Sequence, residues 1–378
     1  MAKDKKRIKE KLLSAISKAE THFSGAKYSL KDNLNLLEPV KIIPYHGFGN
    51  EKYVFIKGRV LEKEKVKTKE DDVSTFKHLR NTLKRYETDE IPDIRVKATF
   101  ADVEMEMTTD KEGFFQFEFH FDEPVDYEKY GKEVKLKLLE SITDNDQKEA
   151  SAQIFVPDKE AEFGVISDID DTVLVSRITE FFKKLKLMLM KDASERSPFP
   201  GIAAFLRALS KGKDNEGRNA LFYVSGSEWN IYDLLLNFFR YHDIPEGPLL
   251  LRDKGSKGEY AADRDQYKKE EIRKILKAYP NFKFICIGDS GQQDAEIYQY
   301  LVEEFPSRIL GIYIRDVTPD ARDKEVRKIA EKVKENGSEM ILVQNTLEAA
   351  HHALKMDWIN QNHLEEIEKD SQRDREGQ

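Results

Sequence analysis

The pattern of hydrophobic and polar residues divides the chain into two halves. From about residue 40 to 157, apolar and polar residues alternate with a period of two, which is typical of strands with one buried face. The candidate strands are 53–61, 103–107, 115–121, 134–138 and 152–156. A helical pattern at roughly 74–86 interrupts them. This half is therefore predicted to be an antiparallel β-sandwich of the immunoglobulin-like kind.

One connection within this half carries a turn signal. Residues 108–113, Thr-Thr-Asp-Lys-Glu-Gly, separate the strand at 103–107 from the strand at 115–121. A short polar stretch that ends in glycine is typical of a hairpin loop. We expect these two strands to pair with each other.

The second half has short apolar runs that alternate with helical stretches. The runs cover 163–167, 220–225, 282–288 and 309–314. Each is too continuously apolar for a half-exposed strand, so the strands are expected to be buried on both faces. The prediction is an α/β domain of the Rossmann-like kind, with a parallel sheet and helices on both faces. Cys286 lies inside the third run, which indicates a small buried hydrophobic residue rather than a catalytic thiol.

The two ends of the chain differ from the rest. Residues 1–24 have apolar side chains at helical spacing among lysines, which predicts a basic amphipathic helix that packs on the protein. From about residue 351 the sequence becomes polar, and we expect a frayed tail. The predicted parts are 1–38 for the helix and linker, 39–157 for the β-sandwich, 158–350 for the α/β domain and 351–378 for the tail.

Composition and charge narrow the class of protein. Of 378 residues, 39% are hydrophobic, enough for a sizeable core. A single cysteine excludes a disulfide framework and a zinc site built from several thiolates, and it favours a reducing compartment. The net charge of -8 argues against a nucleic-acid partner. Because no run of about 18 apolar residues occurs, we expect a soluble, cytoplasmic protein.

Acidic residues follow two of the predicted buried strands. Asp168 and Asp170 come after the first run, and Asp289 and Asp294 come after the third. Ligands of open parallel sheets bind at the carboxyl ends of the strands, so these side chains are expected to meet. Two carboxylates about 4 Å apart repel by roughly 4 kcal/mol at an effective dielectric constant near 20, which favours a cation between them. Oxygen ligands with no nearby His or Cys indicate Mg²⁺.

The Asp-rich turn at 168–172 could also be purely structural. Aspartate favours turns and helix N-caps, so the turn alone is no proof of a site. A calcium loop of the EF-hand kind does not fit, because Val173 stands where glycine is needed and Thr179 where glutamate is needed. The second acidic turn, after another strand, favours the metal-site interpretation.

With these residues the sequence resembles the haloacid dehalogenase-like phosphatases. The motifs of that superfamily match, in chain order, Asp168, Asp170 and Thr172, then Ser225, then Lys268 or its neighbour Lys269, and finally Asp289 and Asp294. Four motifs in the right order make a specific signal.

Longer stretches narrow the resemblance. SDIDDTV, FPGIAAFLRAL, FYVSGSEWNIYDLL, PLLLRD, GDSGQQDAEIY and IYIRDVT are similar to the catalytic domain of the fungal actin-patch phosphatidate phosphatases and their bacterial relatives. The similarity covers about 162–320. The interval from Asp289 to Asp294 is longer than in the commonest form of the superfamily motif, which leaves open whether Asp294 binds a metal directly or through water.

The resemblance implies a Mg²⁺-dependent reaction with an aspartyl-phosphate intermediate. Asp168 would attack phosphorus, and Asp170 would protonate the leaving oxygen and then deprotonate water. The metal would be held by Asp168, Asp170 and Asp289, with Asp294 in or near its shell. The residues expected to hold the phosphate oxygens are Thr172, Ser225, Gly226 and Lys268.

Several of these residues could have structural roles instead. Ser225 could cap the next helix, and Lys268 could be a solvated helix lysine. Arg252 and Arg315 follow predicted strands and could reach a phosphate, yet each could instead pair with the aspartate beside it.

The substrate implied by the resemblance is phosphatidate, which lies in a bilayer. Residues 178–191, ITEFFKKLKLMLMK, predict an amphipathic helix with Phe181 and Phe182 on its apolar face and Lys183 and Lys184 beside it. Such a helix could lie peripherally on an anionic membrane or pack over the active-site edge. Three functions remain open: a phosphatidate phosphatase, a phosphatase of a soluble phosphate ester or phosphoprotein, and a non-catalytic domain that binds a membrane or a partner.

Overall fold

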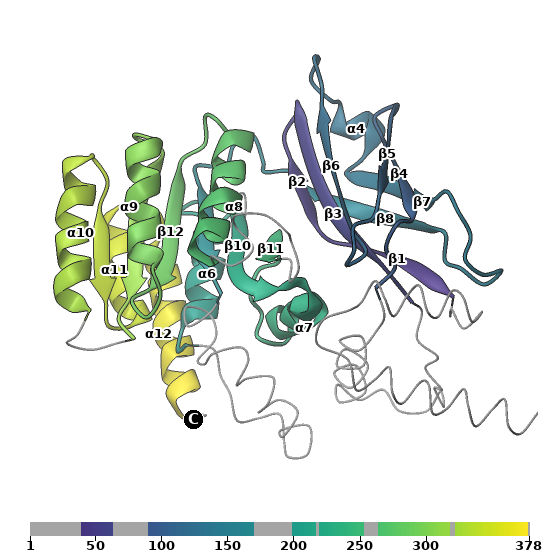
Figure 1. Ribbon diagram of the computed structural model, residues 1–378. Helices are drawn as coiled ribbons and strands as arrows, with labels where there is room; N and C mark the ends of the chain where they lie inside the picture. Colours follow the sequence, from purple (N-terminus) through teal and green to yellow (C-terminus); the bar gives the residue numbers. More distant parts are fainter. Residues whose placement is uncertain are drawn as a thin grey trace, which may run out of the picture. The chain divides into compact units, whose positions relative to one another are not determined.

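The computed structural model describes residues 39–62, 90–169, 199–216, 219–252, 264–317 and 322–376 (Figure 1). They belong to two compact units, a β unit that ends at Ile154 and an α/β unit that begins at Phe155. The helices predicted at 1–24, 74–86 and 178–191 lie outside the described residues.

The β unit consists of antiparallel strands. Its elements are β1 (Val40–Pro44), β2 (Gly47–Gly49), β3 (Tyr53–Glu62), β4 (Arg95–Phe100), β5 (Val103–Thr108), β6 (Phe114–His120), α4 (Tyr127–Tyr130), β7 (Glu133–Leu138) and β8 (Glu149–Phe155). The strands are linked in the order β1-β3-β2-β8-β7-β4-β5, and β6 pairs with β3. The antiparallel β fold is thereby confirmed.

The alternation of residues places the core of this unit. In β7 every second side chain is buried and the others are exposed. In β6 Phe115, Phe117 and Phe119 are buried, and the two residues between them are half-exposed. The strand path brings distant strands together, because the ring of Phe100 in β4 lies 6.1 Å from that of Phe119 in β6. The two layers of the predicted sandwich are therefore parts of one connected sheet.

The predicted hairpin between β5 and β6 is wrong. β5 pairs with β4, and β6 pairs with β3. Ala101 and Asp102 both have positive φ, 46° and 63°, which is the backbone of the turns that join two-residue hairpins, so β4 and β5 form the hairpin instead. The chain then crosses to β3, where the carbonyl of Gly113 accepts a hydrogen bond from the Val60 amide at 2.8 Å.

The α/β unit is built on a parallel sheet of six strands. The strands are β9 (Gly164–Asp168), β10 (Ala220–Glu228), β11 (Leu249–Arg252), β12 (Phe284–Asp289), β13 (Ile309–Arg315) and β14 (Met340–Val343), in the order β11-β10-β9-β12-β13-β14. The four runs predicted from sequence are β9, β10, β12 and β13, and they form the buried centre of the sheet. The α/β class is confirmed.

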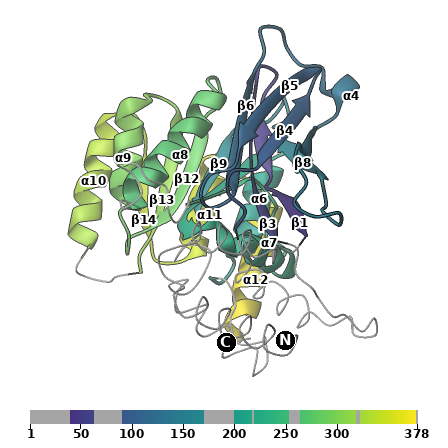
Figure 2. The ribbon, with the colours of Figure 1, turned by 45° about the vertical axis from the view of Figure 1, so that its right-hand side comes forward.

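Helices cover both faces of this sheet (Figure 2). They are α6 (Ile202–Lys211), η1 (Trp229–Ile231), α7 (Tyr232–Tyr241), α8 (Arg264–Ala278), α9 (Asp294–Glu304), α10 (Asp323–Glu335), α11 (Thr346–Lys355) and α12 (Gln361–Glu376). Figure 2 shows α8, α9 and α10 on one side of the strands and α6, α11 and α12 on the other. Tyr313 of β13 packs edge-on against Phe205 of α6, with ring centroids 5.7 Å apart.

Cys286 lies in β12 with none of its surface exposed, as expected. Burial, with a smaller contribution from Asp294, raises the pKa of its thiol. The residue is therefore a neutral part of the core and not a nucleophile.

The prediction of a frayed C-terminal tail is wrong. Residues Gln361–Glu376 form α12, which packs on α6 and α11. The sequence pattern there is dominated by charge, but Leu364 and Ile367, one turn apart, are both buried. In addition, Asp374 accepts a hydrogen bond from the amide of Gly201, just before α6.

Candidate active site at the carboxyl edge of the parallel sheet

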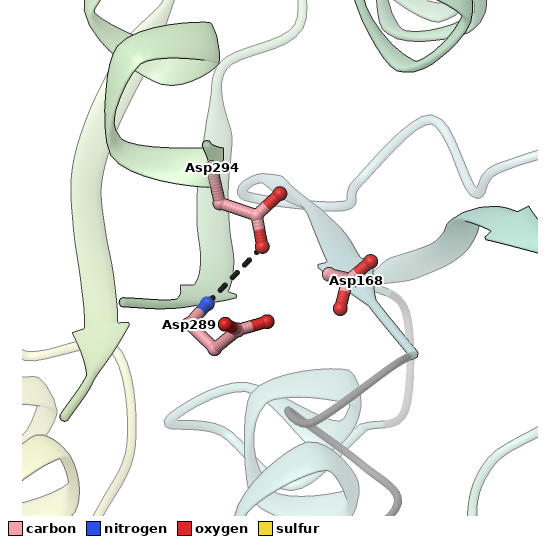
Figure 3. Close-up of side chains that lie close together, drawn as sticks. All are labelled: Asp168, Asp289 and Asp294. Atoms are coloured by element: carbon pink, nitrogen blue, oxygen red, sulfur yellow. Dashed lines mark hydrogen bonds between the residues drawn. The ribbon is translucent and has the colours of Figure 1, made fainter. Parts of the chain in front are cut away.

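Three aspartates converge at the carboxyl edge of the sheet (Figure 3). Asp168 ends β9 and Asp289 ends the neighbouring strand β12, while Asp294 begins α9. Each carboxylate offers one oxygen to a group whose atoms all lie within 4.8 Å of one another. All three residues are buried, with at most 2% of their surface exposed. The two acidic turns predicted from sequence therefore meet.

The loop after β12 holds the Asp289 carboxylate by its own backbone. One oxygen, Oδ1, accepts hydrogen bonds from the amides of Gly291 at 2.7 Å and Gln292 at 3.0 Å. The side-chain amide of Gln292 donates to the other oxygen at 3.3 Å. The loop thus fixes where this carboxylate points.

Asp294 is held against the same strand through a glycine. Its Oδ2 accepts a hydrogen bond from the Asp289 amide at 3.1 Å. A Cβ atom at Gly288 would lie only 2.6 Å from the Cβ of Asp294 and 2.7 Å from its Oδ2. The close approach of α9 to β12 therefore requires glycine at position 288.

Lys268, on α8, is the cation of this cluster. Its Nζ lies 2.7 Å from Asp168 Oδ1, 2.8 Å from Asp294 Oδ1 and 3.2 Å from Gln292 Oε1. Burial alone would lower the pKa of Lys268, but the carboxylates of Asp168 and Asp294 outweigh burial and raise the pKa above its ordinary value. The ammonium is therefore charged at physiological pH, and Lys268 is not a solvated helix lysine. Lys269 instead extends over the ring of Tyr300, 5.3 Å from its centroid.

The charges do not balance within this cluster. Three carboxylates face one ammonium, and each pair of carboxylates repels by roughly 3 kcal/mol at about 4.8 Å and an effective dielectric constant near 20. An all-oxygen donor set with excess negative charge is suited to a hard divalent ion. Asp168, Asp289 and Asp294 could therefore hold a metal ion.

Ser225 and Gly226 belong to the end of β10, on the other side of β9. Val224 pairs with Asp168, so the two residues extend the sheet edge directly beside that aspartate. The hydroxyl of Ser225 accepts a hydrogen bond from the Ser227 amide at 2.9 Å, and it does not cap α7, which begins at Tyr232. Residues 225–227 are called the Ser225 turn below.

Several residues predicted from the sequence to belong to the site lie outside the described residues. They are Asp170, Thr172, Phe181, Phe182, Lys183 and Lys184, together with Asp253, the residue beside Arg252.

Arg315 does not pair with the aspartate beside it. Asp316 accepts hydrogen bonds from Gln344 at 2.7 Å and from Ser290 at 3.4 Å. The guanidinium of Arg315 stacks on Phe199, with its Cζ 3.2 Å from the ring centroid. Burial lowers its pKa to about 10.

Arg322 was not found from the sequence. Its guanidinium donates to the carbonyls of Ser290 at 3.3 Å and Gln292 at 3.1 Å, and it pairs with Glu296 at 2.7 Å. It therefore braces the loop that holds Asp289. No local pattern marks this role, because the loop that Arg322 contacts lies about 30 positions earlier in the chain.

Asp168, Lys268 and the acidic loop after β12 meet at one edge of the parallel sheet, as the sequence motifs predicted for these residues. Residues 163–316 match the family model described as "Phosphatidate phosphatase APP1, catalytic domain". The resemblance predicted from the sequence is confirmed for this segment.

Two curated proteins are similar to this chain. An uncharacterized protein of Schizosaccharomyces pombe is 29% identical over 245 residues, 63% of this chain and 38% of that protein. Phosphatidate phosphatase APP1 of Saccharomyces cerevisiae is 30% identical over 154 residues, 40% of this chain and 25% of that protein. The chain thus spans well under half the length of either relative.

Among solved structures, a carbohydrate acetylesterase from Xanthomonas citri matches at 9% identity over 76% of this chain and 71% of that chain, with a TM-score of 0.23. A β-glucuronidase variant of Bacteroides uniformis matches at 8% identity over 81% of this chain and 40% of that chain, with a TM-score of 0.20. Neither score carries an argument about fold or function.

Among the described residues, no helix is long and apolar enough to cross a bilayer.

Proposed function

We propose that the α/β unit is a Mg²⁺-dependent phosphatase with Asp168 as its nucleophile and phosphatidate as its substrate. The observation that carries the proposal is the meeting of Asp168, Asp289, Asp294 and Lys268 in one buried cluster, inside the segment that matches the catalytic-domain model. The substrate class comes from that family and from the named relative in Saccharomyces cerevisiae.

In the first half of the reaction, an oxygen of Asp168 bonds to phosphorus while the bond from phosphorus to the diacylglycerol oxygen breaks. Asp170, by resemblance, gives its proton to that leaving oxygen. Lys268 lies 2.7 Å from Asp168 and favours the ionised, nucleophilic form of the carboxylate. It also orients the carboxylate at the carboxyl edge, where a substrate can enter.

In the second half, Asp170 takes a proton from water, and the water oxygen bonds to phosphorus while the bond to Asp168 breaks. Inorganic phosphate leaves and Asp168 is regenerated. The Ser225 turn, beside Asp168, would donate to the phosphate oxygens during both halves. When bound by Asp168, Asp289 and Asp294, Mg²⁺ would offset the negative charge of nucleophile and substrate.

The test is release of phosphate from dioctanoyl phosphatidate and from p-nitrophenyl phosphate, with MgCl₂ or with EDTA, by the wild-type chain and Asp168→Asn. We expect Mg²⁺-dependent release from phosphatidate, abolished in Asp168→Asn. Release from p-nitrophenyl phosphate alone would point to a soluble ester or a phosphoprotein as substrate. Activity that survives Asp168→Asn, or that ignores EDTA, would contradict the mechanism.

A further inference from the structure

The buried lysine of the cluster already contacts three acceptors within the protein. An ammonium has three N–H groups, and the Nζ of Lys268 already lies within hydrogen-bond distance of Asp168, Asp294 and Gln292. Lys268 is also only 3% exposed. A phosphate dianion that approaches Asp168 from solvent therefore needs a second cation for its outer oxygens.

Arg264 stands where that cation is needed. It is the first residue of α8, and Lys268 lies four residues later on the same face of the helix, about 6 Å further along its axis. Arg264 is exposed, whereas Lys268 is buried against Asp168. Arg264 thus lies one turn further out than the lysine that contacts the nucleophile.

The Ser225 turn makes room for the Arg264 side chain. A Cβ atom at Gly226 would lie 2.8 Å from Nε of Arg264 and 3.5 Å from its Cζ. The guanidinium therefore lies across the glycine, two residues beyond the position that pairs with Asp168. Among the described residues no carboxylate forms an ion pair with Arg264, so its charge is available to a ligand.

We propose that Arg264 binds the phosphate group of the substrate, together with the Ser225 turn, while Lys268 positions Asp168. The inference rests on the proposed function, since it assigns the phosphate contact of that same site. A planar guanidinium offers two parallel N–H groups to two phosphate oxygens, which suits a terminal phosphate monoester.

The experiment compares the full-length wild type with Arg264→Ala, Arg264→Lys and Arg327→Ala. Arg327, on α10, is exposed and serves as the matched control. We measure binding of inorganic phosphate by calorimetry in MgCl₂, and hydrolysis of p-nitrophenyl phosphate. Arg264→Ala is expected to weaken phosphate binding and to lower kcat/KM by roughly 10- to 100-fold, Arg264→Lys by less, and Arg327→Ala by less than about 2-fold.

A second variant tests the geometry rather than the charge. Gly226→Ala places a methyl group 2.8 Å from Nε of Arg264, closer than a normal contact, so the guanidinium must move and phosphate binding should weaken. In the Arg264→Ala background it should add little, because there is no guanidinium left to displace. Additive effects would overturn the claim that Arg264 lies over this turn in the working protein.

The outcomes distinguish a failure of the Arg264 proposal from a failure of the proposed phosphatase function. If the wild type hydrolyses the ester and Arg264→Ala binds phosphate equally well, Arg264 has no such role while the phosphatase proposal stands. If the wild type is inactive but its phosphate binding is lost in Arg264→Ala, the phosphatase proposal fails and the anion site stands. If the wild type neither hydrolyses nor binds, both are wrong.

Discussion

Replacing Lys268 with methionine tests the electrostatics of the buried cluster. The change removes the one ammonium among three carboxylates whose oxygens lie within 4.8 Å of one another. Breaking a buried ion pair on one side costs about 3–5 kcal/mol, because the remaining charge is left uncompensated. The folded variant can limit this loss by taking up a proton. For an aspartate with an ordinary pKa of about 3.9, that uptake costs about 4 kcal/mol at pH 7. We therefore expect Lys268→Met to lower the free energy of unfolding by about 3–4 kcal/mol at pH 7 in EDTA.

The loss should depend on pH in a defined direction. The folded variant binds one more proton than its unfolded chain, so its stability falls as pH rises. Proton uptake becomes cheaper by about 1.4 kcal/mol for each unit below pH 7, and the difference from wild type should shrink accordingly toward pH 5. In the wild type the pKa of Lys268 is raised, so its contribution is complete below its unfolded pKa and constant over this range.

Tryptophan fluorescence during urea unfolding measures this effect in the α/β unit alone. The chain has two tryptophans, Trp229 and Trp358, and both are buried in that unit. Lys277→Met, an exposed position in the last turn of α8, is the control for loss of a helix lysine. A loss below about 1 kcal/mol, or one that does not change between pH 5 and 7, would refute the reasoning.

Three further changes follow from the packing around the site. Arg322→Ala removes the hydrogen bonds that hold the loop around Asp289. The affinity of the protein for Mn²⁺, measured by calorimetry, should therefore fall about 10- to 100-fold with little change in the free energy of unfolding. An unchanged affinity would rule out this role of Arg322. Gly288→Ala forces α9 away from β12, so it should lower the free energy of unfolding by about 1–3 kcal/mol and also lower the rate of phosphate release. A wild-type unfolding free energy and a wild-type rate would contradict the close approach to Asp294. Ile367→Ala, fully buried on α12, should cost about 2–5 kcal/mol in urea unfolding, whereas a frayed end would lose nothing.

The sequence predicted the centre of the α/β unit because its signals there are local. Continuously apolar strands such as β9 and β12, separated by helices, indicate a parallel sheet that is covered on both faces, and the strand-end rule then brings Asp168 and Asp289 together. The edge strands β11 and β14 have four residues each, too few for a clear pattern.

Contacts between distant segments account for what was missed. The turn at 108–113 has the residues of an ordinary hairpin. However, Ala101 and Asp102 adopt positive φ although neither is glycine, and the tight turn that they form pairs β5 with β4. The charge of α12 conceals the two apolar residues that attach it to the domain. Arg264, by contrast, could have been found, because it lies four residues before Lys268, at helical spacing.

The stacking of Arg315 on Phe199 has a consequence for how this protein can diversify. The chain leaves the sheet at Ile169, directly after β9. It returns at Phe199, whose ring packs against Arg315 at the end of β13. Ile169 and Phe199, the residues on either side of the intervening stretch, therefore both lie at the carboxyl edge of the sheet. The contacts described for Asp289 and Asp294 come from other segments of the chain, so residues that follow the Asp168–Thr172 motif can change while those contacts remain.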